Sequence, residues 1–148
     1  MTDNLKLKPI AIGSLPCDNI EDAMNIVKRD FYEIPFFPQL ARVQKNEDMI
    51  VQLLEGMPGI DFSKNPPELI IDPESEAFYE DLEQFFADYE EISANPDSEL
   101  LNKYGISKEF SSTFPELLKI VSKSKPQYAK GQVVGPFTLS TSLNDISG

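Results

Sequence analysis

Apolar residues gather in a few short segments of this chain and recur at helical spacing between them. Segment 8–12 is mostly apolar and is followed by a Gly-Ser turn, and segment 34–40 is apolar except for its glutamine. Continuous apolarity is typical of a strand that is buried on both faces of a parallel sheet. Segment 128–134 ends in paired valines after a proline stop. We interpret all three segments as strands.

Between these strands the apolar residues recur every three or four positions, which predicts amphipathic helices. Asp18 with Glu21, and Thr113 with Glu116, have the spacing of a capping box and predict two helix starts. A short β-like run at 68–72 predicts an edge strand or part of a hairpin. We expect helices over 18–30, from Asn46 to Pro58, over 75–92, over 97–104 and from Thr113 to Pro126.

Strands that alternate with helices favour an α/β fold with a parallel sheet and crossover helices. In such folds, substrates bind beyond the carboxyl ends of the strands. That rule selects three places in this single domain of residues 1–148: Gly13 with Ser14, Gln39 with Arg42, and the turn from Gly135 to Thr138.

Each of these places has a functional and a structural interpretation. The backbone of Gly13 and the hydroxyl of Ser14 can hold a carboxylate, but a plain strand-to-helix turn also needs glycine. The amide of Gln39 can bind a ligand or form a polar rim. Gly135 allows close backbone approach before Thr138, and it also suits an ordinary turn. Arg42 fits an ordinary surface cation better than an anion clamp.

Charge and composition exclude several classes of function. The formal net charge is −12, so neither nucleic acid nor an anionic membrane surface is an expected partner. No apolar run approaches the ~20 residues of a membrane span, and residues 1–6 lack the pattern of a signal peptide, so we expect a cytoplasmic protein. Histidine is absent and Cys17 is the single cysteine, which leaves no intrachain disulfide and no imidazole chemistry.

Three motifs occur in order: Ile-Gly-Ser-Leu-Pro at 12–16, Ile-Pro-Phe-Phe-Pro-Gln-Leu at 34–40, and Lys-Gly-Gln-Val-Val-Gly-Pro-Phe-Thr-Leu at 130–139. Together they resemble the superfamily of cobalamin-independent methionine synthase and uroporphyrinogen decarboxylase, which also includes corrinoid-linked methyltransferases. The resemblance spans almost the whole chain. It implies the first part of a (β/α)₈ barrel, incomplete at 148 residues and longer in the full protein.

The resemblance also implies a function. In the methionine synthases, the Gly-Ser after the first strand holds the amino-acid end of homocysteine or methionine, a role that would fall to Gly13 and Ser14. The methyl donor would be folate-type or corrinoid. The catalytic zinc of that family is held by His, Cys and Glu from later strands, so we expect zinc in the full-length protein, no metal ligand here and no activity from this chain alone. The decarboxylase alternative lacks a convincing arginine, because Arg42 matches poorly.

Two further expectations concern association. Three parallel strands cannot close a barrel, and an open edge exposes unpaired N–H and C=O groups. We therefore expect the chain to self-associate through that edge or to pair with the missing part of the barrel. The acidic stretch at 74–91 leaves a second functional class open, a non-enzymatic acidic interaction module. A solvated helix face is the plainer interpretation of that stretch.

Overall fold

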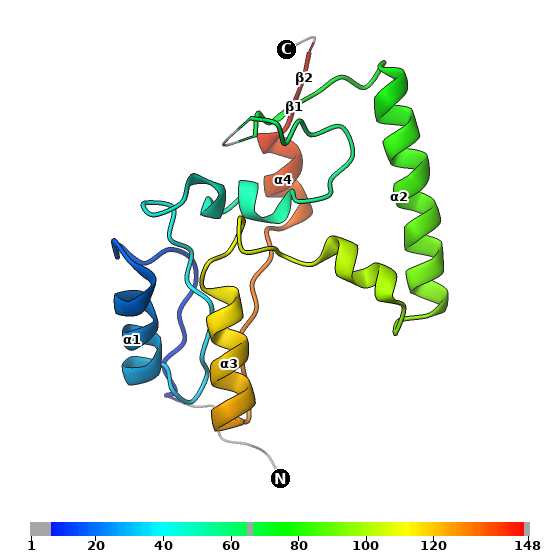
Figure 1. Ribbon diagram of the computed structural model, residues 1–148. Helices are drawn as coiled ribbons and strands as arrows, with labels where there is room; N and C mark the ends of the chain where they lie inside the picture. The colour runs from blue at the N-terminus through cyan, green and yellow to red at the C-terminus, as the bar shows by residue number, and fades with distance from the viewer. Residues whose placement is uncertain (1–6, 65–66, 147–148) are drawn as a thin grey trace.

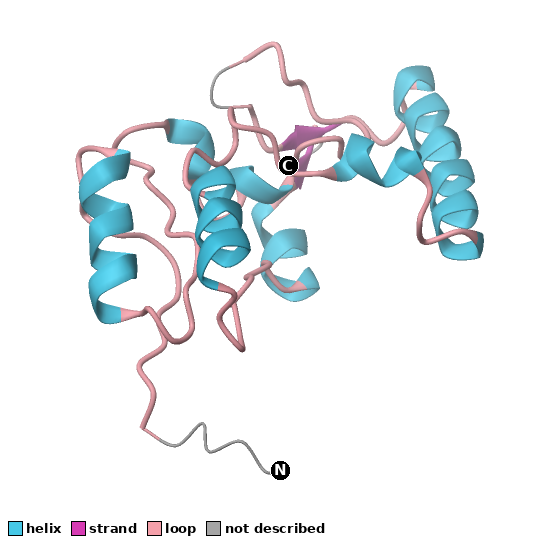
Figure 2. Cartoon of the chain, turned by 60° about the horizontal axis from the view of Figure 1, so that its bottom comes forward, coloured by secondary structure: helices cyan, strands magenta, loops and turns pink. Residues whose placement is uncertain are grey.

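The computed structural model describes residues 7–64 and 67–146; the first six residues, which show no signal-peptide pattern, lie outside this range. It is a mixed α/β structure that is mostly helical (Figures 1 and 2). The elements in chain order are α1 (Ile20–Asp30), the 3₁₀ turns η1 (Lys45–Glu47) and η2 (Val51–Leu53), β1 (Ile70–Ile71), α2 (Glu76–Ala94), the 3₁₀ helix η3 (Glu99–Tyr104), α3 (Phe114–Ser124), α4 (Pro136–Ser142) and β2 (Asn144–Asp145).

All the strand pairing is parallel, as the alternation of strands and helices predicts. Ser14 bridges Gln39, and Phe36 bridges Lys130, so the three predicted strand segments lie side by side in chain order. Strands β1 and β2 form a separate two-stranded parallel sheet, which confirms the edge-strand interpretation of 68–72 and rules out a hairpin.

The strands are shorter than expected. Each of the three segments makes single bridges rather than a ladder, and no closed barrel forms among the described residues. Proline explains part of this result, because Pro35 and Pro38 in the middle segment have no N–H to donate. Hydrogen bonds therefore concentrate at the remaining donors, such as Gln39 N to Gly13 O at 3.2 Å.

The core lies between α1 and the middle segment. Met24, Val27 and Phe36 form its buried centre, and each is at most 3% exposed. The ring of Phe31 meets the ring of Phe36 edge-on at 5.2 Å, and Ile120 of α3 packs against the same cluster. Burying side chains of this size stabilises the fold by about 1.5–3 kcal/mol each, so this cluster fixes the position of the middle segment.

The N-cap of α1 lies one residue later than expected. Asn19, not Asp18, is the N-cap, and its side chain accepts a hydrogen bond from Asp22 N at 2.8 Å. The Asn19 side-chain amide also donates to the Asp22 carboxylate at 2.8 Å, so the two side chains bond to each other at the start of the helix. The N-cap predicted at Asp18 is therefore wrong by one position.

The helix expected from Asn46 to Pro58 is also wrong. The 3₁₀ turns η1 and η2 form there instead, because side chains in this stretch make hydrogen bonds that do not belong to a regular helix. The Asp48 carboxylate accepts from Ile50 N at 2.9 Å and restarts the turn. The Glu47 carboxylate, fully buried, accepts from Leu40 N at 2.8 Å and Ser112 N at 2.7 Å.

Thr113 precedes α3 as expected, but its hydroxyl makes no capping bond. It donates instead to the carbonyl of Pro38 at 2.5 Å, which ties the start of α3 to the middle segment. The predicted Thr113–Glu116 box is therefore wrong. The turn expected after Val134 is also replaced, since Pro136 opens the short helix α4.

Helix α2 lies apart from α1 and α3 (Figures 1 and 2). It begins after the N-cap Ser75, the first residue of the predicted helix, and the Ser75 hydroxyl accepts from Phe78 N at 3.2 Å. Asp88 joins it to η3 by accepting from Lys103 Nζ and from the Tyr104 hydroxyl, both at 2.6 Å. These hydrogen bonds lower the pKa of Asp88 to about 2, and the bond from Lys103 has the largest effect.

Candidate functional site

A small cavity of about 80 Å³ lies where the three parallel segments end. Gly13 comes from the first segment and Gln39 from the second, and both were predicted as site residues. The other lining residues are Ile12, Met49, Leu53, Gln132, Val133 and Val134. The cavity is therefore at the carboxyl ends of the strands, where parallel α/β folds bind ligands.

Two of the sequence motifs meet at this cavity. The N–H of Gly13 donates to Oε1 of Gln132 at 3.0 Å, and Lys130 Nζ donates to the carbonyl of Ala11 at 2.6 Å. Side chains of the third segment thus complete the backbone hydrogen bonding of the first. The N–H that Gly13 was expected to offer to a substrate is paired with Gln132 in this structure.

Gly13 has the backbone conformation that the Gly-Ser turn requires. Its φ is +82°, in the left-handed region that side chains disfavour. A Cβ at this position would lie 4.0 Å from Oε1 of Gln39, so the site tolerates the volume of a methyl group but not the backbone angle.

Gln39 is held by a relay of amides. Its Nε2 donates to Oε1 of Gln52 at 2.9 Å, and Nε2 of Gln52 donates to the carbonyl of Phe110 at 2.9 Å. Gln39 is 2% exposed and Gln52 is 1% exposed, so both amides are fixed by packing as well. The relay leaves Oε1 of Gln39 as an acceptor toward the cavity and Gly13.

Ser14 is exposed at the edge of the site. Its backbone bridges Gln39, but among residues 7–64 and 67–146 its hydroxyl has no hydrogen-bond partner. A hydroxyl in this state is free to donate to a ligand oxygen or to accept from a ligand N–H.

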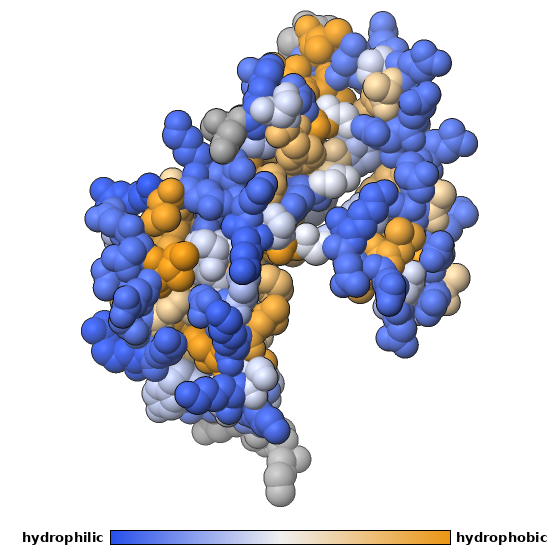
Figure 3. All heavy atoms as spheres, viewed as in Figure 1, coloured by the Kyte–Doolittle hydropathy of each residue, from blue (hydrophilic) through white to orange (hydrophobic). Residues whose placement is uncertain are grey.

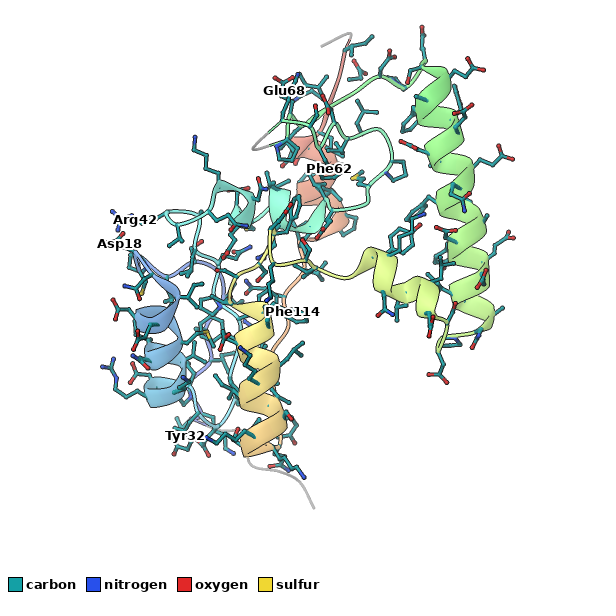
Figure 4. All side chains as sticks on the ribbon, in the orientation of Figure 1. Asp18, Tyr32, Arg42, Phe62, Glu68 and Phe114 are labelled. Atoms are coloured by element: carbon teal, nitrogen blue, oxygen red, sulfur yellow. The ribbon has the colours of Figure 1, made fainter. Side chains whose placement is uncertain are left out.

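The remaining predicted residues do not line this cavity. Gly135 is the exposed N-cap of α4, and Thr138 is exposed within that helix. Phe137, which lies between them, is 80% exposed. Nη1 of Arg42 lies 3.7 Å from Oδ1 of Asp18 in an exposed ion pair, which confirms the interpretation of Arg42 as a surface cation. Figure 4 shows the two labelled side chains next to each other.

The sequence pattern did not predict roles for Gln52, Lys130 or Gln132. The motif at 130–139 contains two of them, so the signal was present, but nothing in it indicated that their side chains reach the first segment. Gln52 falls within the helix predicted from Asn46 to Pro58, which does not form. Its partners lie far along the chain, and local spacing carries no information about them.

A larger, mostly apolar groove of about 470 Å³ adjoins the small cavity. Leu53 lines both. Helix α2 supplies Phe78, Leu82 and Phe85 to the groove, and α4 supplies Leu139. The volume is in the range of ligand-binding cavities.

The described residues do not fit a zinc site. The chain has no histidine, and the described part contains no group of three or more Cys, Asp or Glu side chains that could hold a metal ion. Zinc sites in enzymes use three protein ligands of these kinds.

No described helix is both long and apolar enough to cross a membrane.

Comparisons of this chain with protein-family models, with curated proteins and with solved structures find no match.

Proposed function

We propose that this chain supplies the substrate-binding strand ends of a methyltransferase that resembles cobalamin-independent methionine synthase. The transfer would move a methyl group from a folate-type or corrinoid donor to a thiol such as homocysteine. One observation carries the proposal: the Gly13 N–H donates to the Gln132 side chain at 3.0 Å, so two of the three motifs that suggested the family meet at one site.

The fold proposed with this function is the beginning of a (β/α)₈ barrel. Three parallel segments that neighbour each other in chain order, with α1 between the first and second, are compatible with the start of such a barrel. The zinc that the resemblance implies would be held by residues that this chain does not contain. We therefore expect the chain alone to bind substrate weakly and to be inactive.

The proposed contacts to the amino acid use what the site leaves available. Oε1 of Gln39 accepts a hydrogen bond from the substrate ammonium, and the Ser14 hydroxyl donates to its carboxylate. The Gly13 N–H becomes a second donor only when the Gln132 amide turns away. The apolar lining of Ile12 and Leu53 suits the carbon chain of homocysteine.

The decarboxylase alternative is less well supported. A substrate with several carboxylates needs cationic partners, and the arginine nearest the site, Arg42, is already paired with Asp18. Arg42 also lies outside the residues that line the small cavity.

Nuclear magnetic resonance of the ¹⁵N-labelled chain tests the proposal. L-Homocysteine at millimolar concentration should shift the amide signals of Gly13, Ser14 and Gln39 and the side-chain amide of Gln132. L-Alanine, which has the same ammonium and carboxylate but no thiol arm, should shift them less. Ser14→Ala should weaken the homocysteine response at least threefold. An absence of shifts at these residues would contradict the proposal.

A further inference from the structure

Helix α2 carries a stripe of aromatic residues that are each more than half exposed. Tyr79, Phe86 and Tyr89 are 60%, 56% and 61% exposed. Together with Leu82 they follow the 3–4–3 spacing of one helix face, which is the spacing of a helix–helix seam. Only Asp88 of this 19-residue helix is buried, so α2 packs little of its apolar surface within the chain.

The stripe continues into the apolar groove. Leu82 belongs to the stripe and also lines the groove of about 470 Å³, beside Phe78 and Phe85. The space-filling view shows the hollow that separates the arm of α2 and η3 from the body of the molecule (Figure 3). An apolar stripe that runs into a groove is the geometry by which proteins bind an amphipathic helix.

Charge selects the partner for this surface. Glu83 lies four residues after Tyr79 and three before Phe86, and Glu90 lies four after Phe86, so both exposed acids flank the stripe. Helix α2 contains no lysine or arginine. Its last turn carries Glu90 and Glu91 next to the negative end of the helix dipole, and basic groups from a partner would neutralise this unfavourable arrangement.

The same charges disfavour a second copy of this chain as the occupant. Two α2 helices that met along their stripes would bring Glu83 and Glu90 against identical acids, with no base on either helix. Like charges at such spacing are destabilising.

We propose that the surface formed by Tyr79, Phe86 and Tyr89 with the adjoining groove binds a basic amphipathic helix of a protein partner. Apolar side chains of that helix fill the groove beside Phe78 and Leu82. Its lysines or arginines pair with Glu83 and Glu90. This surface does not depend on the proposed methyltransferase site.

Fluorescence anisotropy tests the proposal with defined probes. The first probe is a labelled 18-residue peptide of leucine and lysine in helical spacing. The second is the same peptide with every lysine replaced by glutamate, and the third has the first composition in scrambled order. We expect micromolar binding of the first probe, no binding of the second, and at least tenfold weaker binding of the third. Raising NaCl from 50 to 300 mM should weaken the first complex, because flanking charges are screened.

Variants separate the stripe from general acidity. Phe86→Ser with Tyr89→Ser should weaken binding of the first probe at least tenfold, while Leu118→Ser, an exposed leucine on α3, should leave it unchanged. Glu83→Lys with Glu90→Lys should weaken the lysine probe and create binding of the glutamate probe. Circular dichroism checks that each variant keeps its helix content.

Three results would overturn the proposal. Equal binding of the scrambled probe would show that charge alone acts. Binding of the chain to phosphatidylcholine vesicles that is lost in the Phe86→Ser, Tyr89→Ser variant would assign the stripe to a membrane surface. A dimer in solution that this double substitution abolishes would assign it to a second copy.

Discussion

The backbone N–H of Gly13 lies 3.0 Å from Oε1 of Gln132, a residue 119 positions further along the chain. This hydrogen bond joins the first and third strand segments across the end of the small cavity. It places a turn that needs glycine against a side chain from a different motif. The stability of the site and its ability to bind a ligand therefore depend on the same contact.

Loss of the Gln132 acceptor should destabilise the chain. Gln132→Ala leaves the partly buried Gly13 N–H unpaired and should lower the free energy of unfolding by about 1 kcal/mol, at the low end for an orphaned donor. Gln132→Glu keeps an acceptor oxygen and should lose less. Urea unfolding followed by circular dichroism measures both. Equal losses in the two variants would show that the hydrogen bond contributes nothing, and Val133→Ala is the control at an exposed neighbour.

Two phenylalanines offer a matched test of the core. Phe36 is 1% exposed and Phe137 is 80% exposed. Phe36→Ala should lower the free energy of unfolding by about 3–5 kcal/mol, because it removes a buried ring and leaves a cavity beside Met24. Phe137→Ala should change it by less than about 0.5 kcal/mol. Thermal or urea unfolding gives both values, and similar losses in the two variants would contradict the core described above.

The loop beside α2 depends on Gly59. Its φ is +75°, and a Cβ there would lie 2.6 Å from Cδ2 of Phe78. Gly59→Ala should destabilise the chain by about 1–3 kcal/mol, through backbone strain and through displacement of α2 from the groove. Gly131→Ala, where a Cβ meets no atom within 4 Å, is the control and should be nearly neutral. A neutral Gly59→Ala would mean that α2 does not rest against this loop.

Low pH should destabilise the contact between α2 and η3, which the Asp88 carboxylate makes with Lys103 and Tyr104. The hydrogen bonds from Lys103 and Tyr104 lower the pKa of Asp88 from its usual 3.8 to about 2 in the folded chain. A carboxyl group whose pKa is lower in the folded chain than in the unfolded chain stabilises the fold. This stabilisation is complete above the pKa of the unfolded chain and is lost as pH falls from about 4 toward 2.

Melting temperatures of the natural chain and of Asp88→Asn, measured between pH 6 and pH 2, test this expectation. The gap between them should stay constant down to about pH 4 and then narrow, because protonation removes the charge that the substitution removes. Asp97→Asn, at an exposed acid in the next loop, should show no such gap. A gap for Asp88→Asn that does not change with pH would contradict the assignment.

Self-association through the sheet edge stays a prediction. Beyond the bridge at Lys130, segment 129–134 has no further strand pairing among the described residues, and Val133 is 80% exposed there. Light scattering should therefore detect a dimer that forms with rising concentration. Val133→Lys should shift it to monomer, because lysine on an edge opposes pairing. Leu118→Lys is the control, and a monomer at every concentration would refute the expectation.

Local pattern predicted α2 and the parallel direction of the strand segments well. The helix predicted over 75–92 corresponds to α2, which spans Glu76–Ala94 after the N-cap Ser75. The segment after Asn46 differs from its prediction. Apolar spacing there suits an α-helix, but the buried Glu47 carboxylate accepts from Leu40 N and from Ser112 N, and local spacing cannot indicate a partner 65 positions away.

Part of the candidate site could be predicted, because local pattern indicates where the strands end. Gly13 follows one predicted strand and Gln39 lies near the end of another, and both line the small cavity. Thr138 also follows one, but Pro136 starts a helix that carries Thr138 to an exposed position. The amide relay through Gln52 rests on tertiary contacts that no single segment encodes.

The long separation between Gly13 and Gln132 also affects how the chain is made. A ribosome that adds about 5–20 residues per second needs roughly 6–24 s to synthesise the intervening stretch. During that interval the Gly13 N–H and the Ala11 carbonyl have no side-chain partner from the third segment. The candidate site can therefore close only after the third segment has been synthesised.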